Sequence, residues 1–235
     1  MPETLGTLLG ASKAVLFDFD GPICDVFRGL PAPGIAAELA DLLSTLAPTL
    51  AGAARSTHDP MEVHRLSQQG GAKVLAAVET ALTRAEIRAV AVAGLPTAGA
   101  VAALQAARNA GRHVAIVSNN STECIREYLY LHGLGVFVDE IIGRPRLRPD
   151  LMKPSPHPLL TAASALGVPA NVTVLVGDSV TDIGAAHAAG ARSIGYANKP
   201  RKVTTLSDAG AGVVVLRMQE VADFLNLRVL PEKEL

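Results

Sequence analysis

The stretch Ala14-Val15-Leu16-Phe17-Asp18-Phe19-Asp20-Gly21-Pro22 determines how the fold of this 235-residue sequence is interpreted. Its first four residues form an unbroken apolar run, which is typical of a strand covered by helices on both faces. Two carboxylates follow at the carboxyl end of that strand, where doubly wound sheets bind their ligands. Because Asp-x-Asp-Gly is also an ordinary turn composition, the stretch alone leaves a functional and a purely structural interpretation open.

Short apolar or β-branched runs alternate with Ala-rich helical stretches through most of the remaining chain. This alternation is typical of βα units around a parallel sheet. We therefore predict an α/β fold with a doubly wound parallel sheet. Further strands are predicted at residues 114–117, 140–142, 172–176, 193–195 and 213–215.

Residues 24–92 contain no convincing strand and carry helix signals instead. Asp59-Pro60-Met61-Glu62 provides an N-cap, a proline at the first helical position and a capping-box glutamate. Other helices are predicted at 35–46, at 72–82 and from a second capping-box pattern at Thr83-Arg84-Ala85-Glu86. We expect a helical domain, residues 24–92, inserted into a core domain made of residues 1–23 and 93–235.

The composition limits the classes of protein that fit. Hydrophobic residues make up 49% of the chain, which is enough to bury a core and excludes intrinsic disorder. Lys and Arg number 21 against 22 Asp and Glu, so the basic excess of a nucleic-acid-binding protein is missing. Cys24 and Cys124 are too few for a disulfide framework. With no signal-peptide pattern and no strongly apolar run of membrane-spanning length, we expect a cytoplasmic protein without a membrane partner.

A second acidic pair follows a later predicted strand, in Gly177-Asp178-Ser179-Val180-Thr181-Asp182. One of these two carboxylates would also suit a helix N-cap. Four carboxylates that converge from two strand ends repel one another unless a cation is bound. Oxygen ligands of this kind favour a hard divalent ion, most plausibly Mg²⁺.

Two other segments supply groups suited to phosphate. Ser118 and Asn119 follow the strand predicted at 114–117 and precede a helix, so hydroxyl, amide and backbone N–H donors meet there. Lys153 stands just before a helix that Ser155 is expected to cap. Taken alone, Lys153 is better interpreted as a solvated surface lysine.

In this order, the segments resemble the haloacid dehalogenase superfamily, and within it the phosphatases of the phosphoglycolate-phosphatase type, which carry a helical cap after the first motif. Asp18-Phe19-Asp20-Gly21 is similar to the first motif and Ser118 to the second. Lys153 is similar to the third motif, and Gly177-Asp178-Ser179 with Asp182 to the fourth. The resemblance covers nearly the whole chain.

The resemblance implies a role for each of these residues. Asp18 is expected to attack phosphorus and form an aspartyl-phosphate, and Asp20 to act as general acid and then general base. Mg²⁺ is expected on the Asp18 carboxylate, the Asp20 backbone carbonyl and Asp178, with Asp182 bound directly or through water. Ser118 and Asn119 are expected to hold phosphoryl oxygens, and Lys153 to stabilise the charge that develops there.

The expected reaction is Mg²⁺-dependent hydrolysis of a small phosphorylated metabolite. A sugar-phosphate mutase of the same fold retains both aspartates and stays open as an alternative. A non-catalytic binding protein on the same scaffold is a further alternative, but such proteins usually lose a motif carboxylate and none is missing here. The sequence does not indicate an oligomeric state.

Substrate selection is expected from the inserted helices. Arg28 is the best candidate to bind the substrate, and the polar segment Arg55 to His58 is a plausible lid that would face the site. His64 and Arg65 are interpreted as solvated helix residues. Cys24 lies near the site but is interpreted as a packed small hydrophobic residue.

Overall fold

Six parallel strands form one sheet in the computed structural model, which describes residues 4–227. Their order across the sheet is β3-β2-β1-β4-β5-β6. The strands are β1 (Ala14–Phe17), β2 (His113–Val117), β3 (Glu140–Ile142), β4 (Thr173–Gly177), β5 (Arg192–Tyr196) and β6 (Val213–Val215). The register pairs Phe17 with Ile116 on one side and with Val176 on the other. The predicted doubly wound α/β fold is thereby confirmed.

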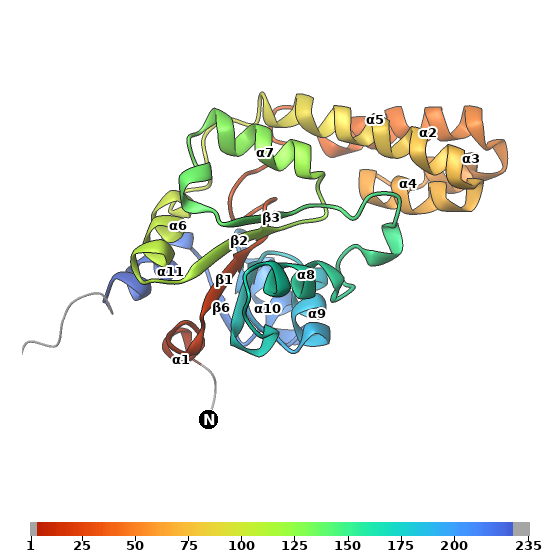
Figure 1. The fold of residues 1–235 in the computed structure, drawn as a ribbon. Helices are drawn as coiled ribbons and strands as arrows, with labels where there is room; N and C mark the ends of the chain where they lie inside the picture. The colour runs from red at the N-terminus through yellow and green to blue at the C-terminus, as the bar shows by residue number, and fades with distance from the viewer. Residues whose placement is uncertain (1–3, 228–235) are drawn as a thin grey trace, which may run out of the picture.

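Helices cover both faces of this sheet (Figure 1). Val15 and Phe17 of β1 face one hydrophobic cluster, whereas Ala14 and Leu16 face another, as the alternation of side chains along a strand requires. The first cluster includes residues of α1 (Leu5–Ala11), α6 (Ala100–Asn109), α7 (Thr122–Leu131) and α11 (Met218–Leu227). The second includes residues of α8 (His157–Ala165) and α9 (Val180–Ala189), and α10 (Arg201–Asp208) packs against α9 through a third cluster.

A helical cap lies between β1 and α6 in the chain and beyond the carboxyl ends of the strands (Figure 1). It consists of α2 (Ala32–Leu46), α3 (Ala51–Arg55), α4 (Pro60–Ser67) and α5 (Ala72–Val90). The predicted start of α4 is confirmed, because Asp59 accepts a hydrogen bond from Met61 N–H at 2.8 Å and Pro60 is the first helical residue. Short 3-10 helices lie at Pro48–Leu50, Gln68–Gly70, Gly135–Phe137, Pro149–Leu151 and Ala170–Val172.

The helix start predicted at Thr83 is wrong. Helix α5 runs without a break from Ala72 to Val90, so Thr83 and Glu86 lie in its interior. Their side chains contact Arg144 instead of the helix's own backbone. Between residues 4 and 227, no helix combines the length and the apolar character that crossing a bilayer requires.

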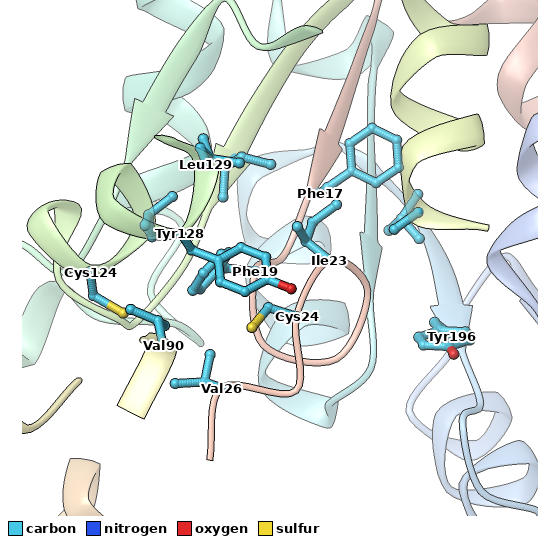
Figure 2. Packing of buried hydrophobic residues seen from close by; sticks show 14 of the residues in the cluster. Phe17, Phe19, Ile23, Cys24, Val26, Val90, Cys124, Tyr128, Leu129 and Tyr196 are labelled. Atoms are coloured by element: carbon cyan, nitrogen blue, oxygen red, sulfur yellow. The ribbon is translucent and has the colours of Figure 1, made fainter. Parts of the chain in front are cut away.

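The segment after β1 is held in place by its apolar residues (Figure 2). Phe19, Ile23 and Cys24 are fully buried, and the Phe19 ring meets the Tyr128 ring edge to face with 5.5 Å between their centroids. Burial raises the pKa of the Cys24 thiol to about 12, so Cys24 is a packed residue, as predicted, and not a nucleophile. Asp18 and Asp20 alternate with these buried residues and therefore turn away from the core.

Candidate active site

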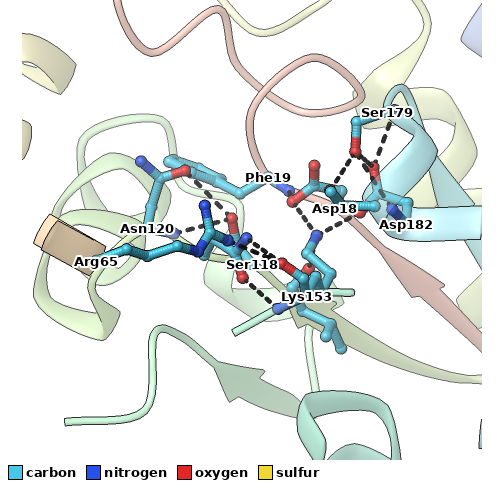
Figure 3. Close-up of polar contacts among 11 residues, drawn as sticks. Asp18, Phe19, Arg65, Ser118, Asn120, Lys153, Ser179 and Asp182 are labelled. Carbon is cyan, nitrogen blue, oxygen red and sulfur yellow. Dashed lines mark hydrogen bonds and ion pairs between the residues drawn. The ribbon is translucent and has the colours of Figure 1, made fainter. Parts of the chain in front are cut away.

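Asp18 stands at the end of β1 and faces a pocket at the carboxyl edge of the sheet. Its backbone N–H donates to Val176 O at 2.9 Å, which extends the pairing of β1 with β4 by one residue. Its Oδ1 accepts hydrogen bonds from Phe19 N–H at 2.7 Å and is 2.8 Å from Lys153 Nζ (Figure 3). Among the described residues, no hydrogen bond to Asp18 Oδ2 is found, so this oxygen remains free for chemistry.

Asp20 lies in the tight turn that follows. Its Oδ1 accepts the Val26 N–H at 3.0 Å, which fixes the carboxylate over the pocket. Gly21 has φ of +104°, a conformation that other L-residues rarely adopt. A Cβ on Gly21 would also lie 2.5 Å from Asp178 Cγ. Only glycine therefore allows the Asp20 turn and the Asp178 carboxylate to approach this closely.

Lys153 is buried, with 2% of its surface exposed, so the surface position suggested by this residue taken alone is wrong, whereas the resemblance had placed it at the site. Its Nζ donates to Val117 O at 3.0 Å and lies between the carboxylates of Asp18 and Asp182. Burial alone would lower the pKa of Lys153, but these two carboxylates outweigh burial and raise it above its ordinary value. The lysine is therefore a fixed positive charge beside Asp18.

Asn119 and Ser118 follow β2 at the same edge. The Asn119 side chain bonds the backbone of Lys153 twice, because Oδ1 accepts Lys153 N–H at 2.8 Å and Nδ2 donates to Lys153 O at 3.1 Å. No hydrogen bond from the Asn119 backbone N–H is found within residues 4–227. Ser118 is 1% exposed and lines the pocket, and its Oγ donates to Asn120 Oδ1 at 3.2 Å. The Asn119 N–H is thus the donor of this loop available to an anion, whereas the Ser118 hydroxyl would have to turn away from Asn120 to bind one.

Asp182 belongs to the first turn of α9. Ser179 is the N-cap of this helix, and its backbone N–H and Oγ both donate to Asp182 Oδ2, at 3.0 and 2.7 Å. The other oxygen, Oδ1, accepts from Lys153 Nζ. Both oxygens of the fully buried Asp182 are therefore engaged by the protein, which suits a positioning role or a role through water more than direct metal binding.

Lys202 is a site residue that the sequence reasoning missed. Its Nζ donates to Asp178 Oδ2, and Asn198 Nδ2 donates to the same oxygen at 3.2 Å. Both partners come from the segment after β5, which ends at the same edge of the sheet. The polar run Asn198-Lys199-Pro200-Arg201-Lys202 directly after a predicted strand was the signal that could have revealed them.

The charges at the site do not balance without a cation. Burial, together with the neighbouring Asp182, raises the pKa of Asp18 to about 7, and burial raises the pKa of Asp20 to about 7. Burial also raises the pKa of Asp178, against the opposing effect of Lys202. One carboxylate oxygen from each of Asp18, Asp178 and Asp182 lies within 4.8 Å of the others. Two ammonium groups among four carboxylates leave an excess negative charge, so this all-oxygen group can hold a divalent metal ion.

The pocket that contains Asp18 has a volume of about 200 Å³. From the cap side, it is lined by Asp59, Met61 and the side chain of Phe27, which follows the Asp20 turn. Arg28 does not line it. Arg28 is exposed, pairs with Asp25 at 3.4 Å and lines a neighbouring cleft that includes Asp20 and Asp178.

The polar segment Arg55 to His58 lines a different groove, on the cap itself. Arg55 pairs with Asp41 of α2 at 3.4 Å, and both Arg55 and His58 lie in the groove between α2 and α3. The interpretation of His64 and Arg65 as solvated is wrong. His64 is fully buried, with Nε2 3.8 Å from a Glu79 oxygen, and Arg65 Nη2 donates to Lys153 O at 3.1 Å.

A buried ion pair joins the cap to the site. Arg144, which follows β3, bonds both oxygens of Glu86 in α5, at 2.8 and 3.2 Å, and neither side chain is exposed. Arg144 also donates to Asn119 O at 3.0 Å, and Glu86 accepts from the amide of Asn120 and from Ser121 N–H. The loop that carries Ser118 and Asn119 is therefore tied to a cap helix. Sequence reasoning missed this pair because Glu86 was assigned to a capping box.

Comparison with known proteins agrees with this geometry. Residues 12–190 match the model of the haloacid dehalogenase-like hydrolase family. A phosphoglycolate phosphatase of Xylella fastidiosa is 31% identical over 194 residues, which are 77% of this chain and 79% of that protein. CbbY from Rhodobacter sphaeroides, solved in complex with phosphate, has a TM-score of 0.65 at 19% identity, over 92% of this chain and 99% of that chain. A hydrolase from Pseudomonas syringae has a TM-score of 0.66 at 19% identity, over 91% of this chain and 98% of that chain.

This chain belongs to the haloacid dehalogenase-like hydrolases. It is an enzyme of that family, and the resemblance to the family's phosphatases that the motifs indicated is confirmed. The two solved structures support the fold alone, because their sequence identities are low.

Proposed function

We propose that this enzyme hydrolyses small phosphomonoesters with the help of Mg²⁺ and through an aspartyl-phosphate on Asp18. The observation that carries the proposal is the asymmetry of the Asp18 carboxylate. Its Oδ1 is bound by Phe19 N–H and Lys153 Nζ, whereas Oδ2 accepts no hydrogen bond from residues 4–227, and Asp18 lines the pocket. A carboxylate held by one oxygen presents the other to an electrophile in a fixed direction.

In the first step, Asp18 Oδ2 attacks phosphorus and the bond between phosphorus and the alcohol oxygen breaks. Asp20 donates its proton to that oxygen, for which a pKa of about 7 is well suited near neutral pH. In the second step, Asp20 takes a proton from water, and the resulting hydroxide displaces Asp18 from phosphorus. Lys153, the Ser118 hydroxyl and the Asn119 N–H hold the phosphoryl oxygens during both steps.

A bound Mg²⁺ would supply positive charge that lets an anionic carboxylate approach an anionic phosphoryl group. Asp178, whose Oδ1 accepts no hydrogen bond from residues 4–227, is the carboxylate best suited to hold it, and Asp18 and the Asp20 backbone carbonyl would complete the set. Asp182 contributes by fixing Lys153 and the start of α9, since both of its oxygens are engaged.

We propose that the substrate is a small phosphorylated metabolite, because a phosphoglycolate phosphatase is among the relatives and the pocket around Asp18 has a volume of about 200 Å³. Residues 24–92 would act as the cap domain that closes over it, and residues 1–23 and 93–235 as the catalytic core. A cytoplasmic location is proposed because Cys24 and Cys124 are free and buried, as thiols of a reducing compartment are.

A direct test is phosphate release from 4-nitrophenyl phosphate and from a panel of small phosphomonoesters, with Mg²⁺ and with a chelator. We expect release that depends on Mg²⁺. Conversion of a sugar phosphate into its isomer without phosphate release would instead support the mutase alternative, and no turnover of any ester would contradict the proposal.

A further inference from the structure

The pocket around Asp18 has two ends of different chemistry. At the inner end, Lys153, Ser118 and Asn119 supply a fixed cation and hydrogen-bond donors for a phosphoryl group. At the outer end, the cap contributes Phe27, Asp59 and Met61, which are an aromatic ring, a carboxylate and a thioether. The alcohol that leaves must lie against this outer end, because the inner end is taken by the phosphoryl group.

No cation lines the outer end among the described residues, although arginines lie close by. Arg144 Nη1 is 3.8 Å from Met61 Sδ, but its charge is paired with Glu86 in the buried ion pair. Arg65 is engaged by Glu62 at 2.5 Å and by Lys153 O. Arg28 lies in the adjoining cleft, which shares Asp20 and Asp178 with this pocket, and is paired there with Asp25, whereas Arg55 lines a groove on the cap. A leaving group with a carboxylate or a second phosphate would therefore meet Asp59 without a compensating charge.

Asp59 is placed to act on a ligand. It is exposed, and only its Oδ1 is used for capping α4, through Met61 N–H. Its Oδ2 accepts no hydrogen bond from residues 4–227. Phe27 is half-buried and presents an aromatic surface in the same pocket. A carboxylate together with an aromatic face is a combination that favours an ammonium group.

We propose that Asp59 determines specificity and selects phosphomonoesters of amino alcohols over phosphorylated acids. This inference rests on the proposed phosphatase function. A protonated amine on the leaving alcohol is attracted by Asp59 and by the face of Phe27. A carboxylate at the same position is repelled by Asp59. Among leaving groups of equal size, the charge of the leaving group therefore determines the rate of hydrolysis.

The test uses three phosphomonoesters with two-carbon alcohols that differ in charge: 2-aminoethyl phosphate, ethyl phosphate and phosphoglycolate. For the unmodified enzyme, kcat/KM should fall in that order. In Asp59→Asn, the ratio of kcat/KM for 2-aminoethyl phosphate to that for phosphoglycolate should fall about tenfold, while ethyl phosphate changes little. Asparagine is also a good N-cap, so α4 keeps its start. Asp59→Ser is a second variant that retains capping.

The control is Asp41→Asn, which removes a cap carboxylate that lies in the groove with Arg55 and not in the pocket. It should leave all three kcat/KM values unchanged. An unmodified enzyme that prefers phosphoglycolate, or an unchanged ratio in both Asp59 variants, would overturn the inference. If the enzyme hydrolyses none of the three esters and no 4-nitrophenyl phosphate, the proposed function itself fails, which is a different result.

Discussion

The side chain of Asn119 bonds both backbone polar groups of Lys153, accepting from its N–H at 2.8 Å and donating to its carbonyl at 3.1 Å. These bonds join two loops that follow different strands. They hold the peptide unit from which the Lys153 side chain reaches Asp18. In the proposed reaction, Asn119 would therefore act through the position of Lys153 as well as through its own backbone N–H.

Asn119→Ala should lower kcat by about 10²-fold, because an error of about 1 Å in the position of Lys153 is costly for preorganised electrostatics. KM should change less. Asn119→Asp keeps the acceptor for Lys153 N–H, loses the donor and adds a negative charge beside the phosphoryl group, so it should lower kcat at least as much as Asn119→Ala. The measurement is steady-state kinetics with 4-nitrophenyl phosphate, and a change in KM alone in Asn119→Ala would argue against this role.

Asp20→Asn should reduce the rate most for esters with poor leaving groups. General acid catalysis contributes typically about 10²–10⁴-fold, and an alkoxide needs it more than 4-nitrophenolate does. Comparing single-turnover rates for ethyl phosphate and 4-nitrophenyl phosphate tests this. An equal loss for both esters in the first step would show that Asp20 is not the acid.

Glu86→Gln should destabilise the protein by about 3–5 kcal/mol, because it leaves the charge of Arg144 buried and unpaired. The control is Glu38→Gln, which breaks an exposed ion pair with Arg88 and should cost at most about 1 kcal/mol. Denaturant unfolding measures both free energies. An equal loss of unfolding free energy in the two variants would mean that the Glu86–Arg144 pair does not hold the cap to the core.

Mg²⁺ should stabilise the protein more at pH 7.5 than at pH 5. The pKa values of Asp18 and Asp20 are raised to about 7, so the folded protein without metal binds more protons than the unfolded chain between about pH 4 and pH 7. Its stability therefore falls as pH rises through this window, and a bound cation offsets that loss once the carboxylates ionise. Thermal unfolding with Mg²⁺ and with a chelator at both pH values tests this, and an equal shift in Tm at both would contradict it.

The sequence predicted the strands and the polar segments at their carboxyl ends because their signals are local. The apolar run of β1 and the carboxylates after it lie within one short stretch, and parallel strands bring such stretches to a common edge. A helix start was predicted inside α5 because Thr83 and Glu86 have the spacing of a capping box. Residues with the same spacing also occur in the middle of a helix, as they do here. Only the contact with Arg144, distant in sequence, separates the two cases.

Contacts between residues distant in sequence also explain what was not predicted about Lys153, Lys202 and the cap residues near the pocket. Lys153 was predicted as a site residue only through the family resemblance, because nothing near it in sequence shows that Asp18 and Asp182 surround its ammonium group. Lys202 pairs with Asp178, a carboxylate that follows another strand of the sheet, β4. Arg28 was favoured for its position after the first motif, yet the side chain that meets the pocket from this segment is its neighbour Phe27. Which side of a loop faces a pocket depends on packing that periodicity does not encode.

The proposed mechanism requires that Asp18 is phosphorylated during turnover. The most direct measurement is acid quenching of the enzyme in the presence of Mg²⁺ and 4-nitrophenyl phosphate, followed by mass spectrometry of the peptide that contains Asp18. We predict that this peptide gains the mass of one phosphoryl group, that hydroxylamine removes it, and that Asp18→Asn shows neither the adduct nor turnover. Turnover of the Asp18→Asn variant at a near-normal rate would contradict the account.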